Sequence, residues 1–224
     1  MKLYHYVHCP FCVRVRMALG RLNVEYESHV LPYDDEQTPN QLCQKKMLPI
    51  FQWKDADQIN ESLEIIKRLD AKDDLKTSML ENSSYLNEVE ELLQKIGSPV
   101  HNLAMPYWVL LPEFNASSRR YFIEKKSKKR GPFHLLVQNK QQYLDELTPV
   151  IQSVQSKVSP FYLGEVLSIF DLMIASHLWG LYIVPEFQFP IGLHKYLQTV
   201  SRICHFNYLE DFWKEDPLTN KNLI

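Results

Sequence analysis

Apolar and polar residues in the first third of the chain alternate between strand-like and helical periods. Residues 3–7 form a short apolar run, and apolar side chains then recur at helical spacing from residue 9 to about residue 22. A second strand-like run covers residues 24–31 and ends at Pro32. A strand, a helix and a second strand in this order predict a parallel pair joined by a right-handed crossover.

A short helix, a hairpin and a further helix are predicted next. Thr38 is expected at the cap of the short helix, with Pro39 at its first position. Residues 49–60 have the pattern of a hairpin, and residues 63–69 place apolar side chains on one face of a helix. The resulting order βαβαββα predicts an α/β, thioredoxin-like domain over residues 1–71.

The remainder of the chain shows helical periods without strand-like alternation. Polar residues 72–77 indicate a linker, residues 78–215 an all-α domain, and residues 216–224 a polar tail. The first long helix of the all-α domain is expected to end at Gly97. The apolar stretch 103–111 is expected to lie in the core or at the interface between the domains.

Later segments of the all-α domain carry further helix signals. One helix is expected to finish with the basic run 125–130, which we interpret as a solvated helix end; attraction of an acidic protein substrate is the alternative. The helical pattern of residues 133–158 contains Pro149, where we expect a kink or a break. Ser168 and Asp171 form a capping-box pattern, and the helix after them is apolar nearly all round, which predicts the buried centre of the domain.

The residues Cys9, Pro10, Phe11 and Cys12 stand where the first strand ends and the first helix begins. Cys9 is expected at the helix cap, close to backbone N–H groups that have no partner within the helix. The partial positive charge there favours a thiolate, and sites of this kind lower a cysteine pKa from about 8.5 to roughly 3.5–7.5. Cys12 lies one turn further on and can close a disulfide with Cys9. We therefore predict Cys9 as the attacking sulfur and Cys12 as the resolving one.

Two other interpretations of this cysteine pair stay open on these residues alone. The pair can be half of a zinc site with His5 and His8 nearby, although closed zinc sites need four ligands and Cys43 and Cys204 are single and distant. The two cysteines can also be buried and inert. Their place after a strand and next to Pro10 favours redox chemistry without a metal.

Composition and charge narrow the class of partners. The chain has 224 residues, 45% of them hydrophobic, and a formal net charge of −2, which gives no reason to expect nucleic acid or an anionic membrane as a partner. We expect neither a membrane span nor a secretory signal, because no apolar run has the required length or pattern. Four cysteines in a chain of this length do not indicate a disulfide-stapled secreted domain, so we expect a cytoplasmic protein.

Three segments, taken in order, resemble the glutathione site of glutaredoxins and of the N-terminal domains of glutathione transferases. They are Cys9–Cys12, Leu48–Pro49 and Glu61–Ser62. Together with the residues after Cys12 and the chain length, they resemble the glutaredoxin 2 family in particular, which joins a glutaredoxin domain to a helical, transferase-like domain. The likeness covers nearly the whole chain and is strongest in its first third. One departure is Cys43, which stands where a glycine is expected in that family.

The resemblance implies a role for each segment. Pro49 is expected to be cis and to leave the backbone N–H and C=O of Leu48 free to pair with the cysteinyl unit of glutathione. Glu61 is expected to accept from the γ-glutamyl ammonium, and Ser62 to bind the neighbouring carboxylate. The remaining candidates for contact with glutathione are Phe11, Lys45 and Lys46. Candidates to add positive charge near Cys9 are His8, Arg14 and Arg16.

The resemblance also implies an activity. The implied activity is that of a glutaredoxin, a glutathione-dependent thiol–disulfide oxidoreductase with glutathione as co-substrate. Such an enzyme would reduce protein–glutathione mixed disulfides and protein disulfides through Cys9 and Cys12. The expected partners are glutathione and glutathionylated or disulfide-containing proteins, and we expect a monomer. Two alternatives are a glutathione transferase acting on electrophiles, in which Cys12 would have no use, and a non-catalytic interaction protein that keeps the fold as a scaffold.

Overall fold

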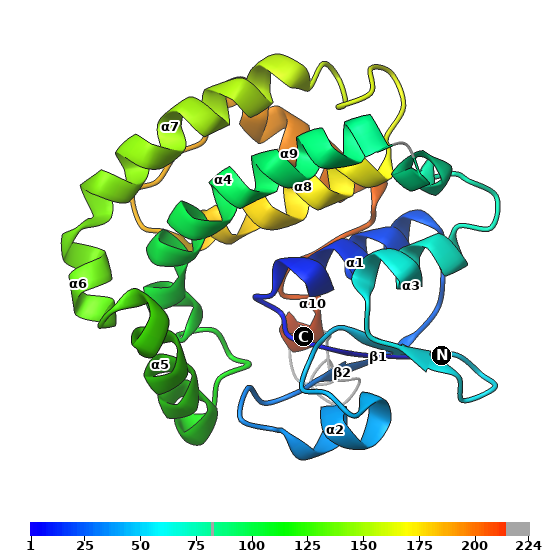
Figure 1. The fold of residues 1–224 in the computed structure, drawn as a ribbon, viewed down its shortest axis with the longest axis horizontal. Coiled ribbons are helices and arrows are strands. Elements are labelled where there is room, and N and C mark those ends of the chain that lie inside the picture. The colour runs from blue at the N-terminus through cyan, green and yellow to red at the C-terminus, as the bar shows by residue number, and fades with distance from the viewer. Residues whose placement is uncertain (82, 214–224) are drawn as a thin grey trace, which may run out of the picture.

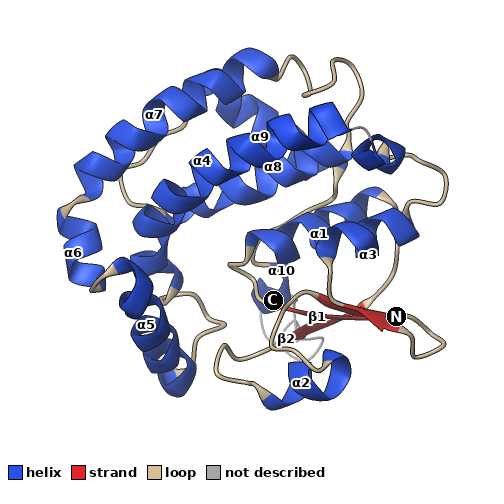
Figure 2. Ribbon diagram, in the orientation of Figure 1, coloured by secondary structure: helices blue, strands red, loops and turns tan. Residues whose placement is uncertain are grey.

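A mixed sheet with helices on both faces forms the first domain of the computed structural model, which describes residues 1–81 and 83–213 (Figures 1 and 2). The elements of this domain are β1 (Lys2–His5), α1 (Pro10–Arg21), β2 (Glu27–Val30), α2 (Gln37–Cys43), β3 (Ile50–Gln52), β4 (Gln58–Ile59) and α3 (Ser62–Leu69). Their order is the predicted βαβαββα, so the α/β, thioredoxin-like class is confirmed.

The strands lie in the order β2-β1-β3-β4. β1 is parallel to β2, with Leu3 opposite Ser28, as the strand–helix–strand pattern predicts. β3 is antiparallel to both β1 and β4, and the last pair is the predicted hairpin. Helices α1 and α3 cover one face of the sheet and α2 covers the other (Figure 1). The chain passes from the C-terminal end of β1, an inner strand, into α1, and the cysteine pair lies at this end of the sheet.

The elements that the structure describes in the second domain are all helices. Its elements are η1 (Thr77–Glu81), α4 (Ser83–Trp108), α5 (Ala116–Arg130), α6 (Phe133–Gln138), α7 (Lys140–Lys157), α8 (Ile169–Trp179), η2 (Gly180–Ile183), α9 (Ile191–Ile203) and α10 (Glu210–Trp213). Every residue of α8 is buried, and α8 packs against α1, α4 and α9. Ser168 and Asp171 form the predicted capping box, in which the Ser168 N–H donates to the carboxylate at 2.8 Å. The predicted centre of the domain is confirmed.

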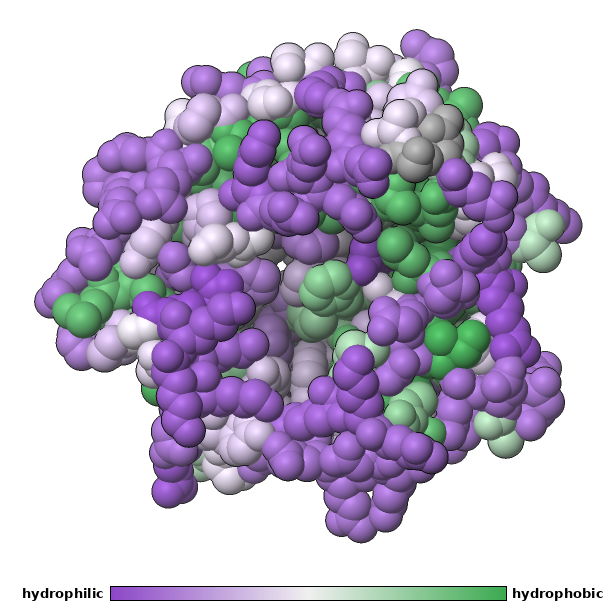
Figure 3. Space-filling model, in the orientation of Figure 1, coloured by the Kyte–Doolittle hydropathy of each residue, from purple (hydrophilic) through white to green (hydrophobic). Residues whose placement is uncertain are grey.

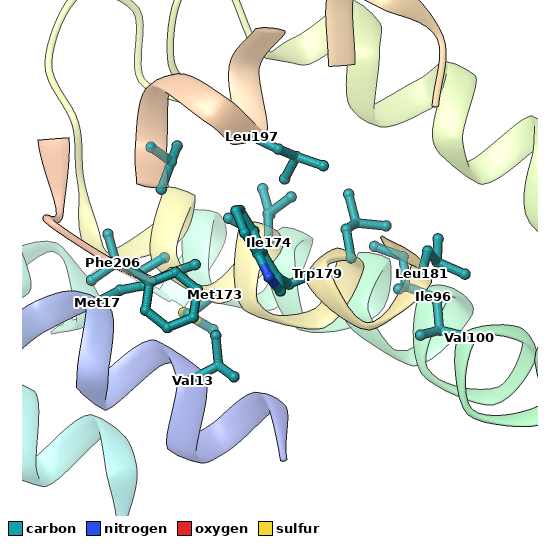
Figure 4. Close-up of a cluster of buried hydrophobic side chains, with 14 of the residues drawn as sticks. Val13, Met17, Ile96, Val100, Met173, Ile174, Trp179, Leu181, Leu197 and Phe206 are labelled. Atoms are coloured by element: carbon teal, nitrogen blue, oxygen red, sulfur yellow. The ribbon is translucent and has the colours of Figure 1, made fainter. Parts of the chain in front are cut away.

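The two domains share one apolar core. Val13 and Met17 of α1 lie beside Met173 of α8, and Ile96 of α4 belongs to the same cluster (Figure 4). Trp108, in the stretch predicted for the core or the interface, is 2% exposed. Because this core crosses from one domain to the other, the position of α1 depends on helices of the second domain as well as on the sheet.

The helix end predicted at Gly97 is wrong. Helix α4 continues through Gly97 to Trp108, because Ile96 and Val100 on either side of the glycine are buried in the same core, and a continuous helix keeps both on one face. Of the kink or break expected at Pro149, the break is absent: α7 continues through Pro149, and the helical pattern is broken at Asn139, between α6 and α7. Pro149 is on the exposed face of α7, where water can satisfy the carbonyl that a proline leaves unpaired.

The starts of α2 and of the second domain also differ in detail from the prediction. Thr38 is not the cap of α2, which begins at Gln37 with Glu36 as the cap residue. Thr38 lies inside the first turn, and its backbone N–H donates to the Asp35 carboxylate at 2.9 Å. The polar segment 72–77 contains a fully buried residue, Leu75, whose carbonyl accepts the Ile169 N–H. The division into two domains at this segment stays a prediction, and the tail 216–224 lies outside the described residues.

Candidate active site

The cysteine pair lies at the N-terminus of α1. Cys9 is the cap residue, with an extended backbone (φ −76°, ψ 123°), and its carbonyl accepts the Val13 N–H at 2.9 Å. Pro10 is the first helical residue, where a missing N–H costs nothing. Cys9 is half-buried and Cys12 is buried. All four cysteines of the chain are free thiols in this structure.

The pKa of Cys9 is lowered to about 6. The hydrogen bond with the Cys12 side chain lowers this pKa most, burial opposes it, and the charge of His8 and the backbone N–H groups of Cys12 and Phe11 lower it further. These groups stabilise the thiolate, which is the nucleophilic form of a cysteine. Cys9 can therefore be largely ionised at neutral pH.

Cys12 has the opposite environment. Burial raises the pKa of its thiol well above the ordinary value, and the interaction with Cys9 raises it further. The backbone N–H of Tyr6 lies 3.4 Å from its sulfur. Cys12 is therefore a neutral thiol that can donate to the Cys9 thiolate. The two sulfurs have the unequal acidities that an attacking and a resolving cysteine require.

His8 is enclosed by rings that come mainly from the second domain. The ring centroids of Trp108, Phe114 and Phe122 lie 5.2–5.3 Å from that of His8. Glu113, between α4 and α5, accepts a hydrogen bond from His8 Nδ1 at 2.9 Å and from the His8 backbone N–H at 3.0 Å. The second domain thus fixes the residue immediately before Cys9.

A cavity of about 250 Å³ opens beside the Cys9 sulfur, between the two domains. In Figure 3 the visible face is hollowed near its centre, between the α5 side and the first domain, and apolar side chains lie in the hollow. Sequence-predicted residues that line the cavity are Cys9, Phe11, Leu48 and Lys46. Further lining residues are His8, Tyr33, Met105, Trp108, Phe122 and Lys126.

The Leu48–Pro49 peptide bond is cis, as expected. Leu48 and Pro49 are buried, and Leu48 packs in a small cluster with Tyr6, Cys12 and Ile50 directly under the site. Among the described residues, no group hydrogen-bonds to the backbone N–H or C=O of Leu48. These two groups remain available to an extended peptide.

Glu61 and Ser62 lie at the start of α3. Glu61 is the exposed cap residue, and Ser62 is buried in the first turn. The Oγ of Ser62 accepts a hydrogen bond from Arg14 Nε at 3.0 Å. The guanidinium of Arg14 lies 4.7 Å from the centroid of the Phe11 ring, which is 44% exposed. Arg14 therefore links the cysteine motif to the Glu61–Ser62 segment.

Arg16 lies away from the site, whereas Cys43 lies next to it. Arg16 is two residues beyond Arg14, so the helix turns it about 200° away from that side chain. Its guanidinium donates to the carbonyls of Asn207 and Tyr208, and it does not face Cys9. Cys43 ends α2 and packs against the cluster under the site; burial raises the pKa of its thiol.

The left-handed residue of that turn is Gln44, with φ 54°, rather than Cys43. The position at which a glycine was expected therefore has an ordinary helical conformation, and a cysteine fits it without backbone strain.

Two contributors to the site carry no local signal in the sequence. Glu113 is 105 residues from His8, and Tyr33 lines the cavity from the loop between β2 and α2. Trp108 lies in the stretch predicted for the core or the interface, and the structure adds that it lines the cavity. The interpretation of residues 125–130 as a solvated helix end is wrong for Lys126: it lines the cavity, and burial lowers the pKa of its ammonium. Lys125, Lys128 and Lys129 are exposed as expected.

Within residues 1–81 and 83–213, no group of three or more His, Cys, Asp or Glu side chains is arranged to hold a metal ion. Over the same residues, no helix combines the length and the apolar character needed to cross a membrane.

Comparison with known proteins decides the family. The family model described as Glutaredoxin 2, C terminal domain, matches residues 88–212, which is more than half of the chain. The chain belongs to the glutaredoxin 2 family. The model described as Glutathione S-transferase, N-terminal domain, matches residues 3–77. The resemblance seen in the cysteine motif and the two segments after it is confirmed.

Individual proteins of known identity agree with this chain in length or in fold. Glutaredoxin 2 of Escherichia coli strain K12 is 28% identical over 213 residues, which cover 93% of this chain and 98% of that protein. The crystal structure of glutaredoxin 2 from Salmonella typhimurium in complex with glutathione superposes with a TM-score of 0.79 at 28% identity, covering 94% and 97% of the two chains. The glutathione transferase Omega 3C of Trametes versicolor, at 17% identity and a TM-score of 0.60, shares the fold.

Proposed function

We propose that Cys9 and Cys12 carry the thiol–disulfide exchange of this glutathione-dependent oxidoreductase, and that glutathione binds in the cavity beside Cys9. The observation that carries the proposal is a cysteine with a pKa of about 6 at a helix N-terminus, next to a buried thiol and to a free backbone edge at Leu48. A thiolate in that position is a nucleophile at neutral pH.

The reduction of a protein–glutathione mixed disulfide needs only Cys9. The Cys9 thiolate attacks the glutathione sulfur, a Cys9–glutathione disulfide forms, and the protein leaves as a thiolate. The thiolate of a second glutathione then attacks the bound glutathione sulfur, which releases oxidised glutathione and regenerates the Cys9 thiolate. The low pKa of Cys9 makes it both a nucleophile in the first step and a good leaving group in the second.

A protein disulfide needs both cysteines. Cys9 attacks one of its sulfurs and forms a mixed disulfide with the protein. Cys12 then loses its proton, attacks the Cys9 sulfur and closes the Cys9–Cys12 disulfide, and the protein leaves with its second thiol reduced. Two glutathione molecules reduce the Cys9–Cys12 disulfide and are themselves joined as oxidised glutathione.

Glutathione is held by groups that surround the sulfur. Its cysteinyl unit pairs with the backbone of Leu48 before the cis Pro49, in the manner of an added strand. Glu61 accepts from the γ-glutamyl ammonium and Ser62 binds the adjacent carboxylate. Phe11 covers the ligand from the helix side. A cation that lines the cavity, Lys46, meets the glycine carboxylate.

The protein partners are glutathionylated or disulfide-containing proteins, and the exposed Phe11 beside Cys9 provides an apolar contact for them. We place the reaction in a reducing compartment, the cytoplasm, because the four cysteines form no structural disulfide. We propose a monomer as the working form, which sedimentation at two protein concentrations tests.

The test measures two activities of wild type, Cys9→Ser and Cys12→Ser. One is reduction of a glutathione–peptide mixed disulfide, and the other is conjugation of glutathione to an aryl halide. We expect wild type and Cys12→Ser to reduce the mixed disulfide and Cys9→Ser to be inactive. Only wild type is expected to reduce a protein disulfide by the two-cysteine route. Strong conjugation with weak reduction in wild type would instead support a transferase, and full activity of Cys9→Ser would remove Cys9 from the mechanism.

A further inference from the structure

Helix α5 carries an unusual share of the positive charge of the chain. Seven of its 15 residues are Lys or Arg and only Glu124 is acidic, although the whole chain has a formal net charge of −2. In the part of the chain that the structure describes, no ion pair joins any of these seven side chains to a carboxylate. The protein therefore does not itself compensate the charge of this helix.

Two arginines hold α5 in place near its ends. Arg119 donates from Nε to the Val109 carbonyl at 2.6 Å, and Arg130 donates to the Asn102 side chain at 2.7 Å. Asn102 lies in α4, and Val109 directly follows that helix. These contacts explain the positions of the two arginines and leave the four lysines between them unexplained.

The lysines of α5 divide between two faces of the helix. Lys126 lines the cavity beside Cys9. Lys125, Lys128 and Lys129 are spaced three or four residues apart, so they share a face, and all three are exposed; we call them the basic face of α5. Hydrophilic residues cover the α5 side of the hollow in Figure 3. Positive charge therefore extends from the surface of α5 into the cavity that holds the reactive sulfur.

Lys126 lies where a cation without a partner is unfavourable. Its ammonium is 5.6 Å from the centroid of the Tyr33 ring and 5.5 Å from that of Phe122. Burial lowers the pKa of Lys126 most and the neighbouring cations of α5 lower it further, whereas the charge of Cys9 opposes them. The helix dipole favours cations in the last turn only, and Lys126 precedes that turn. A further anion in the cavity would offset this unfavourable position.

The two halves of a mixed disulfide differ in the anions that they bring. In the function proposed above, the carboxylates of glutathione are bound by Lys46 and Ser62, and Lys46 also pairs with Glu36 at 3.3 Å. An acid that pairs with α5 therefore belongs to the other half, the protein that carries the glutathionylated cysteine. Nucleic acids and lipids contain no disulfide for Cys9 to attack, so the position of α5 beside this sulfur favours a protein.

We propose that α5 is the docking surface for the protein substrate, and that it selects proteins with acidic side chains next to the glutathionylated cysteine. Lys126 pairs with the acid nearest to the disulfide, and the basic face of α5 pairs with acids further along the substrate. The proposal rests on the glutathione-dependent reaction of Cys9 proposed above. Complementary charges of this kind act mainly on the rate of association, and salt screens them.

The test uses mixed disulfides of glutathione with two peptides that differ only beside their cysteine. One peptide has glutamates on both sides of the cysteine, and the other has glutamines there. At low ionic strength, wild type is expected to have a kcat/KM about tenfold higher for the glutamate peptide, since steering by complementary charges speeds association by about 10- to 1,000-fold. The ratio is expected to fall towards one at about 0.5 M salt.

A triple variant with Lys125→Gln, Lys128→Gln and Lys129→Gln removes the basic face of α5. It is expected to lower the ratio of the two kcat/KM values to below about 3. Reduction of the small mixed disulfide of glutathione with 2-mercaptoethanol is expected to stay unchanged, which shows that the fold and Cys9 are intact. Lys126→Gln is expected to remove the advantage of a single glutamate directly beside the peptide cysteine.

A charge-matched variant serves as the control. Lys54, Lys72 and Lys195 are exposed and lie outside α5, so replacing all three by glutamine removes the same charge elsewhere. This control is expected to keep the preference for the glutamate peptide. If it loses the preference as the α5 variant does, net charge and not α5 is responsible, and the proposal is overturned.

Three further results decide between the possibilities. Equal kcat/KM values for the two peptides in wild type at low ionic strength overturn the proposal, and so does a preference that the α5 variant retains in full. Binding to phosphatidylserine vesicles that only the α5 variant loses, without a peptide preference in wild type, overturns it in favour of a membrane surface. If wild type reduces neither the peptides nor the small mixed disulfide, it is the proposed function that fails.

Discussion

Glu113 and His8 join the two domains directly beside Cys9. Oε1 of Glu113 lies 2.9 Å from Nδ1 of His8, and both side chains are buried. The same carboxylate accepts the backbone N–H groups of His8 and, through Oε2 at 2.9 Å, of Val7. A buried N–H without a partner costs as much as a lost hydrogen bond, so this carboxylate holds the segment between β1 and Cys9 in its conformation.

Replacing Glu113 by alanine is expected to lower the free energy of unfolding by about 3–5 kcal/mol, because it removes one partner of a buried pair and leaves two backbone donors unsatisfied. Unfolding in urea, followed by tryptophan fluorescence, measures the loss. Glu91→Ala provides the control: Glu91 is exposed on α4, and its removal is expected to change the free energy by less than about 0.5 kcal/mol. Equal effects of the two substitutions would show that the Glu113 contacts contribute nothing.

Removing the Cys12 thiol is expected to raise the pKa of Cys9 above its value of about 6, because the hydrogen bond with the Cys12 side chain is the largest cause of that low value. Cys12→Ala removes the donor, whereas Cys12→Ser keeps a hydroxyl donor at the same position. The rise is therefore expected to be larger in the alanine variant. Thiolate absorbance between about pH 4 and pH 10 measures both. Identical titrations of Cys9 in the two variants would contradict the assigned cause.

The reduced protein is also expected to gain stability as the pH rises. The pKa of Cys9 is about 6 in the folded state and 9.0 for an unperturbed thiol, so the unfolded state binds more protons between these values. The contribution of Cys9 to stability is fully present above the unfolded pKa and is lost as the pH falls through about 6. Urea unfolding of wild type and Cys9→Ser at about pH 5 and about pH 8 tests the sign. The free energy of unfolding of wild type, minus that of Cys9→Ser, is expected to be larger at the higher pH.

The features that could be predicted from the sequence depend on residues close together in the chain. Cys9 at the cap of α1 follows from a strand, a proline at the first helical position and a cysteine one turn later. Asp171 in the capping box lies three residues from Ser168. The segments at Pro49 and Glu61 became informative only through their order after the cysteine motif, which is why their roles came from the resemblance to a family.

The features that were missed depend on contacts between distant residues. Nothing near Glu113 in the chain marks it as a partner of His8, and Lys126 lies within a basic run whose other lysines are exposed. The wrong helix end at Gly97 has the same origin. Local propensity favours a break there, but the buried stripe on either side of this residue stabilises a continuous helix.

Gly20 and Gly97 form a matched pair, since both lie within helices and differ in what surrounds them. A Cβ on Gly20 would lie 2.0 Å from the carbonyl oxygen of Cys204, at the place where the end of α1 meets the end of α9. The backbone at Cys204 cannot rotate away as a side chain can, so Gly20→Ala is expected to destabilise the fold by about 1–3 kcal/mol.

A Cβ on Gly97 would meet nothing within 4 Å. Gly97→Ala is therefore expected to stabilise the fold by about 0.5–1 kcal/mol, because alanine loses less backbone entropy in a helix. Thermal unfolding of the two variants beside wild type compares them. A rise of the melting temperature in both variants would mean that α1 and α9 do not approach each other as closely as the 2.0 Å distance requires.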